Sequence, residues 1–174
     1  LHCLEPTCAS VCPVGALRKT AQGPVTYDES RCIGCRYCML ACPFGVPRYE
    51  WSVRWPKVSK CDLCADRVAA GQQPACAEAC PTGATLFGER DQLLAEARRR
   101  LAENPAGYAD HIYGVSEVGG TSVLFLSPVA FETLDLRRDL QREPLPLLTY
   151  RVLSKIPHFV GLCGVALGGI WWIT

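Results

Sequence analysis

One segment of the chain sets its architecture: CIGCRYCMLACP, at residues 32–43. Its spacing is C-x2-C-x2-C-x3-C-P, the run with which bacterial proteins hold [4Fe-4S] clusters. Three cysteines this close together can reach three irons of one cubane, whereas structural zinc sites usually combine two separated C-x2-C pairs. The segment therefore favours iron–sulfur clusters over zinc.

Cysteine also dominates the composition of the chain. The 174 residues include 12 cysteines, and all but Cys163 lie between Cys3 and Cys80. The odd count in this region argues against a disulfide framework, which usually uses an even number of cysteines. The formal net charge is only +1, and no block of five or six like charges occurs. That balance argues against a nucleic-acid binder.

The cysteine run is repeated on both sides of residues 32–43. A downstream copy at residues 61–81 carries an inserted loop, and an upstream copy at residues 3–13 lacks the cysteine that should stand three positions before Cys3. We therefore expect a cysteine immediately before Leu1, so that the chain begins inside a motif. The cysteines of the two copies are Cys3, Cys8, Cys12, Cys61, Cys64, Cys76 and Cys80.

The ligands of each cluster are expected to cross between motifs. A local run reaches three corners of a cubane, and in two-cluster ferredoxins the cysteine before proline ligates the other cluster. By this rule one cluster is held by Cys12, Cys32, Cys35 and Cys38. A second is held by Cys3, Cys8, Cys42 and the cysteine expected before Leu1. The remaining set could hold one cluster alone, but crossing predicts that it serves two clusters shared with a motif upstream of Leu1: Cys61, Cys64, Cys76 and Cys80.

The segments between and after the motifs show local structure signals. Residues 23–27 and 84–87 read as short strands, and residues 121–126 are strand-like after a Gly-Gly turn. Residues 91–104 place Leu and Ala on one face and Arg away from it, which predicts an amphipathic helix stopped by Pro105. These elements are expected to form the scaffold around the cluster loops.

The C-terminal end predicts a membrane anchor. No charged residue occurs from Ile156 to Thr174, and Trp171 and Trp172 fall where an interfacial belt would lie. The alternative is a buried core helix. We expect a cluster-binding domain at residues 1–90 whose N-terminal part is missing, a helix, strand and extended connecting segment at residues 91–150 that packs on it, and an anchor helix at residues 151–174.

The motifs resemble those of a known family. The stretches that show this resemblance are residues 2–13, 32–48, 60–84 and 118–124. They are similar to the four-cluster, ferredoxin-type iron–sulfur subunits of membrane-bound oxidoreductases, of the formate dehydrogenase-N beta and hydrogenase-2 type. The resemblance implies an α+β fold of tandem bacterial ferredoxin-like [4Fe-4S] domains with a C-terminal transmembrane helix. It also implies four clusters in the full-length protein, two built largely from this chain and two shared with the missing N-terminal motif.

The resemblance further implies a function in electron transfer without catalysis. Electrons would pass through the clusters between a catalytic subunit, a NiFe hydrogenase or a molybdenum or tungsten formate dehydrogenase, and an integral membrane quinone-reducing subunit, a cytochrome b or a polytopic quinone-binding protein. In such relatives the cluster domain faces the periplasm. No catalytic motif is visible in the chain.

Two alternatives stay open at this point. The same cluster chain could serve a molybdopterin reductase complex of the sulfur, nitrate or dimethyl sulfoxide type, with electrons running in reverse. The single C-terminal helix favours the formate dehydrogenase and hydrogenase branch. The cysteines could instead bind zinc in a structural membrane tether that carries no electrons.

Overall fold

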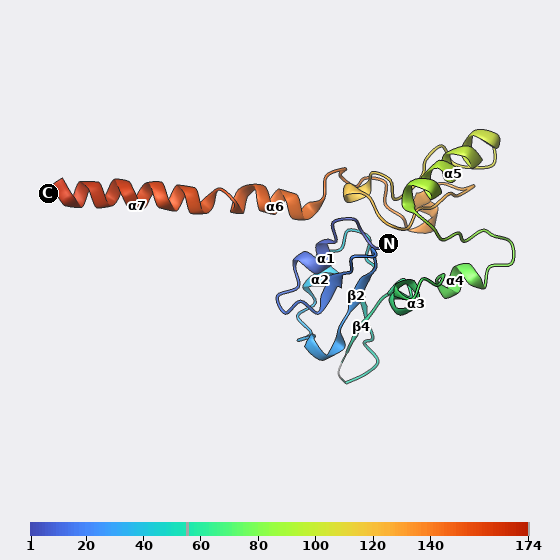
Figure 1. Cartoon of the computed structure of the whole chain (residues 1–174), viewed down its shortest axis with the longest axis horizontal. Coiled ribbons are helices and arrows are strands. Elements are labelled where there is room, and N and C mark those ends of the chain that lie inside the picture. The colour runs from blue at the N-terminus through green and yellow to red at the C-terminus, as the bar shows by residue number, and fades with distance from the viewer. Residues whose placement is uncertain (55, 174) are drawn as a thin grey trace.

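The computed structural model describes residues 1–54 and 56–173 (Figure 1). In the first half, β1 (Leu17–Lys19) pairs antiparallel with β2 (Val25–Tyr27), and β3 (Arg48–Tyr49) pairs antiparallel with β4 (Val58–Ser59). The other elements, in chain order, are α1 (Thr7–Ser10), η1 (Glu29–Arg31), α2 (Tyr37–Ala41), α3 (Ala65–Ala69), α4 (Ala75–Glu78), α5 (Arg90–Glu103), η2 (Glu117–Gly119), η3 (Phe131–Leu134), α6 (Leu145–Leu153) and α7 (Ile156–Ile173). The fold thus mixes short helices and strands, as expected for a ferredoxin-type domain.

The cysteine motifs explain why the first helices are so short. Arg36 adopts a left-handed conformation at φ 65° just before α2, and Cys42 is extended at its end. Proline at position 43 disfavours the helical region for Cys42, so the helix cannot continue. Each motif is therefore a loop, one helical turn or slightly more, and an exit at proline.

A small apolar core holds the first half together. Leu17 and Val25 from the first strand pair, Tyr49 and Val58 from the second, and Cys38 from α2 are buried against one another. Partly buried side chains pack around them, and these include ligand cysteines and an aromatic ring: Cys8, Ala9, Cys12, Tyr27, Cys32 and Met39. The core therefore contains part of the predicted ligand set, namely Cys8, Cys12, Cys32 and Cys38.

The second half is built around a buried aromatic pair. Tyr113 and Phe131 are almost fully buried, with ring centroids 5.2 Å apart. Tyr113 also meets Phe44 edge-on at 6.3 Å, so this cluster touches the exit of the middle cysteine motif. Backbone hydrogen bonds tie residues 120–123 to residues 1–4. The second half thus braces the upstream motif.

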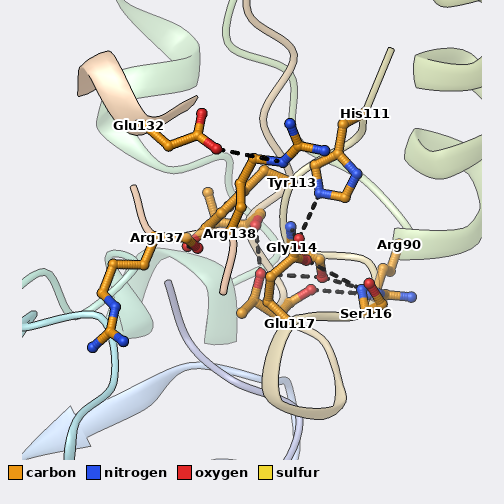
Figure 2. A network of polar contacts seen from close by, with 11 residues as sticks. Arg90, His111, Tyr113, Gly114, Ser116, Glu117, Glu132, Arg137 and Arg138 are labelled. Carbon is orange, nitrogen blue, oxygen red and sulfur yellow. Dashed lines mark hydrogen bonds and ion pairs between the residues drawn. The ribbon is translucent and has the colours of Figure 1, made fainter. Parts of the chain in front are cut away.

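A buried carboxylate organises the loop between these aromatic residues (Figure 2). Glu117 receives hydrogen bonds from the backbone amides of Gly114 at 2.8 Å and Ser116 at 3.2 Å, and its other oxygen lies 2.5 Å from Nε2 of His111. Gly114 has φ +97°, and a Cβ there would meet the hydroxyl of Thr121 at 2.5 Å. Only glycine therefore fits where the loop closes on Glu117.

The predicted helix at residues 91–104 is confirmed, since α5 covers Arg90–Glu103 and buries Ala97. The predicted strand at residues 23–27 is confirmed by β2. The predicted strand at residues 84–87 is wrong: this segment is irregular, with Leu86 and Phe87 exposed, and the amide of Thr85 turns to the sulfur of Cys80. Because that amide donates to the Cys80 sulfur, it is not available for a hydrogen bond between strands.

The prediction of a strand at residues 121–126 is also wrong. Only isolated bridges form there, between Cys3 and Thr121 and between Tyr113 and Phe125. Ser122 and Val123 donate to carbonyls at residues 1–2, whereas Thr121 donates to Gly114 and Phe125 pairs with Tyr113. The segment changes partners within a few residues, so no continuous ladder develops.

The C-terminal helices extend away from the rest of the molecule (Figure 1). α6 lies beside α1 at its start and is followed by α7. Residues Leu145–Ile173 are long and apolar enough to cross a membrane, and the protein buries none of the apolar window. Among the described residues nothing buries this helix, which disfavours the alternative of a buried core helix, and α6 runs across the boundary expected at residue 150. Thr174 lies outside the described residues.

We predict that Glu117→Gln lowers the free energy of unfolding by about 1–3 kcal/mol, because an amide leaves a buried N–H group without its acceptor. The matched change Glu132→Gln affects an exposed ion pair with Arg138 at 3.8 Å and should cost less than about 1 kcal/mol. Urea denaturation of the purified full chain measures both. Equal losses in the two variants would contradict the role assigned to Glu117.

The same comparison has a pH dependence. Burial acts to raise the pKa of Glu117, but the hydrogen bonds from His111 and Gly114 outweigh it and lower the pKa below the ordinary 4.5. A depressed folded pKa stabilises the protein above the unfolded pKa, and this contribution is lost as pH falls through the folded value. The difference in stability between Glu117→Gln and the parent should therefore shrink below about pH 4.

Candidate iron–sulfur centres

Four predicted ligands line one cavity in the first half of the chain. The cavity is small, about 20 Å³, and lies between α2 and the two strand pairs. Its sulfur groups are those that the crossing rule combines, one from the upstream motif and three from the middle one: Cys12, Cys32, Cys35 and Cys38. The other lining residues are Val14, Ala16, Leu17, Tyr27, Ile33, Tyr49 and Val58.

The packing of α1 against α2 brings these cysteines together. Cys12 follows α1, and Cys38 lies in the first turn of α2. Gly34 has φ +71°, which lets the chain curl between the cysteines on either side of it. The approach of Cys12 to the middle motif depends on tertiary contact, because 20 residues separate it from Cys32.

The environment of this cavity acts on its thiols in opposite ways. Burial raises the pKa of Cys38 to about 11, and the nearby Cys8 adds to the effect. At Cys12, burial also acts to raise the pKa, but backbone amides of residues 14–17 outweigh it and lower the pKa. One of these amides, from Ala16, lies 3.2 Å from the sulfur. Amides that face a sulfur stabilise the thiolate, which is the form that binds iron.

A second group of predicted ligands lies close to the first. Burial, and then the charge of Cys42, raise the pKa of Cys3, and the same two causes raise the pKa of Cys8 to about 11. The thiols of Cys3 and Cys8 in the upstream motif and the last cysteine of the middle motif are thus neighbours. Cys8 also acts on Cys38, so the two groups adjoin.

The third group is more open. Cys61 and Cys76 are exposed, and Cys64 and Cys80 are partly exposed. Cys80 accepts hydrogen bonds from the Thr85 amide, at 3.4 Å, and from Thr82, and these lower its pKa to about 6. Arg67 pairs with Glu78 and closes the inserted loop.

Among the described residues, no group of three or more His, Cys, Asp or Glu side chains converges tightly enough to chelate a single metal ion.

The structure adds two polar groups that sequence reasoning missed. The His2 side chain is buried, accepts a hydrogen bond from the Val25 amide at 2.8 Å on Nδ1, and leaves Nε2 without a partner among the described residues. Burial is the main cause that lowers the pKa of His2 to about 3. The hydroxyl of Tyr27, in the wall of the cavity, is likewise buried, and no described residue lies at good hydrogen-bonding geometry to it. The position of His2 beside Cys3 was the only signal in the sequence.

The basic residues near the motifs have structural partners. Lys60 donates to the carbonyls of Val25 and Cys61, which ties β2 to the start of the third motif. The guanidinium of Arg36 lies 4.5 Å from the ring centre of Trp51 and 5.8 Å from that of Tyr49. The Arg36 guanidinium therefore packs over two aromatic rings, one in β3 and one just after it.

The family to which the chain belongs follows from comparison with known proteins. Residues 1–90, more than half of the 174 residues, match the 4Fe-4S dicluster domain. The chain is a member of this family, and it binds [4Fe-4S] clusters. The cavity with four thiols and inward-facing amides fits such a group, because thiolates are the protein ligands of these clusters.

Curated relatives point to a narrower group. The chain is 44% identical over 174 residues to a protein of Nitratidesulfovibrio vulgaris, covering 99% of this chain and 47% of that protein. It is 43% identical over 162 residues to the hydrogenase-2 operon protein HybA of Escherichia coli O157:H7, covering 78% and 49%. It is 36% identical over 176 residues to a formate dehydrogenase iron-sulfur subunit of Haemophilus influenzae, covering 98% and 55%. The chain thus spans about half the length of these relatives.

Alanine substitutions test the crossing of ligands. We predict that Cys12→Ala and Cys35→Ala each remove the same cluster signal and about four irons, because both thiols line one cavity. Cys42→Ala should instead remove the signal that Cys3→Ala removes. Low-temperature EPR of the reduced protein and iron analysis measure this outcome.

The control for these variants is Cys163→Ala, which changes a cysteine on α7 far from the motifs and should leave both signals intact. If Cys12→Ala and Cys3→Ala removed one signal and Cys42→Ala and Cys35→Ala another, each motif would hold its own cluster. That result would refute crossing.

Proposed function

We propose that this chain is part of the iron–sulfur subunit of a membrane-bound oxidoreductase complex and relays electrons between a catalytic subunit and a membrane subunit. The cavity lined by Cys12, Cys32, Cys35 and Cys38 is the observation that carries the proposal. A [4Fe-4S] cluster accepts and donates one electron at a time. The chain's residues hold such clusters, shield them with apolar side chains and direct amides at their sulfurs.

The arrangement of the cysteine groups supports a relay rather than an isolated centre. Cys8, from the second predicted set, lies near enough to influence Cys38, from the first. Cys61 follows Lys60, whose ammonium group binds the carbonyl of Val25 in the core. Three adjoining sets favour a sequence of closely spaced clusters, and we propose four in the full-length protein, in tandem ferredoxin-like domains.

The relatives support the identity of the catalytic partner. HybA is a hydrogenase-2 operon protein, and other relatives are formate dehydrogenase iron-sulfur subunits. We propose a NiFe hydrogenase or a molybdenum or tungsten formate dehydrogenase as the catalytic subunit, and a quinone-reducing cytochrome b or polytopic protein as the membrane subunit. α7, apolar and unburied, supports the membrane attachment.

The content of iron and sulfide tests the proposed function. We predict roughly sixteen irons and sixteen acid-labile sulfides per full-length subunit in the intact complex, and EPR signals of coupled [4Fe-4S] clusters on stepwise reduction. About half these amounts would reduce the number of clusters to two. Zinc in place of iron, with no reducible signal, would make the protein a structural tether and refute electron transfer.

Truncation tests the membrane anchor. We predict that ending the chain after Lys155 moves the protein from the membrane fraction to the soluble fraction, because the nine residues of α6 are too short to span a bilayer. Carbonate extraction followed by immunoblotting measures the distribution. The matched variant Leu162→Ile keeps the helix apolar and should stay in the membrane.

The side of the membrane needs a separate experiment. We propose that the cluster domain lies on the periplasmic side, and the resemblance to formate dehydrogenase-N and hydrogenase-2 subunits supports this placement. Protease added to spheroplasts should then cleave the cluster domain. Protection in spheroplasts together with cleavage in inverted vesicles would place the domain in the cytoplasm.

A further inference from the structure

The oxygen of Tyr27 is buried, and no described residue lies at good hydrogen-bonding distance and angle to it, although the Cys32 sulfur and the backbone amide of Val58 are its polar neighbours. Tyr27 is the last residue of β2 and pairs across the sheet with the buried Leu17. This register turns its ring into the cavity that Cys12, Cys32, Cys35 and Cys38 line. The ring belongs to the core, and the hydroxyl reaches the space where the sulfur groups meet.

Burying a hydroxyl without a hydrogen-bonding partner lowers the stability of the fold, so a tyrosine at this position needs an explanation. Leaving such a group without a partner costs about 1–3 kcal/mol. Val58 and Ile33 in the cavity wall offer the hydroxyl no side-chain acceptor, and the nearby backbone amide of Val58 is a donor. The sulfur of Cys32 is the neighbour that can accept. A phenylalanine would fill the same core position without that cost. The hydroxyl therefore points to an acceptor that the bound cluster supplies.

We propose that the Tyr27 hydroxyl donates a hydrogen bond to the sulfur of Cys32 when that sulfur ligates the cluster, and that this bond raises the reduction potential of the cluster held by Cys12, Cys32, Cys35 and Cys38. The inference rests on the proposed ligand set. A tyrosine hydroxyl, with an ordinary pKa near 10, keeps its proton at neutral pH and is a donor. An iron-bound thiolate is a better acceptor than a neutral thiol.

The direction of the effect follows from charge. Reduction adds a negative charge to the cluster, and a hydrogen bond to its sulfur stabilises the more negative state. Tyr27 would thus set the potential of one centre relative to its neighbour, since the second set, with Cys3, Cys8 and Cys42, does not share this cavity wall. A difference in potential between adjacent centres sets how favourable the electron step between them is.

The test is a redox titration of the intact complex monitored by EPR. Tyr27→Phe removes only the hydroxyl, so it should shift the potential of this one signal to a lower value while the iron content and the other signals stay unchanged. Tyr37→Phe is the matched control, because Tyr37 stands between two ligands of the same motif but is exposed. In Tyr37→Phe, the reduction potential of this cluster should equal that of the parent protein.

A second variant keeps the test decisive if Tyr27→Phe fails to assemble. Incorporation of 3-fluorotyrosine at position 27 keeps the shape of the ring and makes the hydroxyl a stronger donor, so the potential should rise. An unchanged potential in an assembled Tyr27→Phe or fluorotyrosine protein would overturn the proposal. Absence of reducible clusters in the parent protein would overturn the proposed function itself, so the two failures are distinguishable.

Discussion

The structure depends on the short reach of a cysteine side chain. A local C-x2-C-x2-C run can hold three corners of a cubane, and the fourth ligand has to arrive from another part of the chain. Here Cys12 comes from the segment after α1 and meets Cys32, Cys35 and Cys38 at one cavity because α1 packs against α2. The strand pairs form around this contact, and their apolar residues supply the core. The packing of this half therefore exists largely to bring two cysteine motifs together.

The second half of the chain stabilises that arrangement from outside. Residues 120–123 hydrogen-bond to residues 1–4, and the ring of Tyr113 rests on Phe44 at the exit of the middle motif. Glu117 holds the loop that makes these contacts, through two backbone amides and His111. A cluster-binding loop has little apolar area of its own, so bracing from a neighbouring layer supplies stability that the loop lacks. The network in Figure 2 thus acts on the cluster region through the backbone.

The relation between the anchor and the clusters follows from the same packing. α6 lies beside α1, and α7 continues away from the body as an apolar helix that no described residue buries (Figure 1). The helix that suits a membrane thus begins next to the motif that contributes Cys12 to the first cavity. A short path between clusters and membrane is what an electron-transfer subunit requires. The membership of the dicluster family and the similarity to HybA and formate dehydrogenase subunits agree with this arrangement.

The local elements could be predicted where their signals are local. The helix of α5 has a periodic apolar face and a proline stop, and the apolar run of α7 has no charge to interrupt it. The predictions of strands at residues 84–87 and 121–126 were wrong, because a strand forms only where a partner strand hydrogen-bonds along its length. The backbone amide of Thr85 instead donates a hydrogen bond to the sulfur of Cys80. Residues 121–125 divide their hydrogen bonds between two segments. By itself, the sequence determined the cofactor, because ligand type and spacing are local properties of the chain. Only the tertiary structure decided which thiols share a cavity and that polar atoms of Tyr27 and His2 are buried near them, since burial and contact between distant segments are properties of the packed chain.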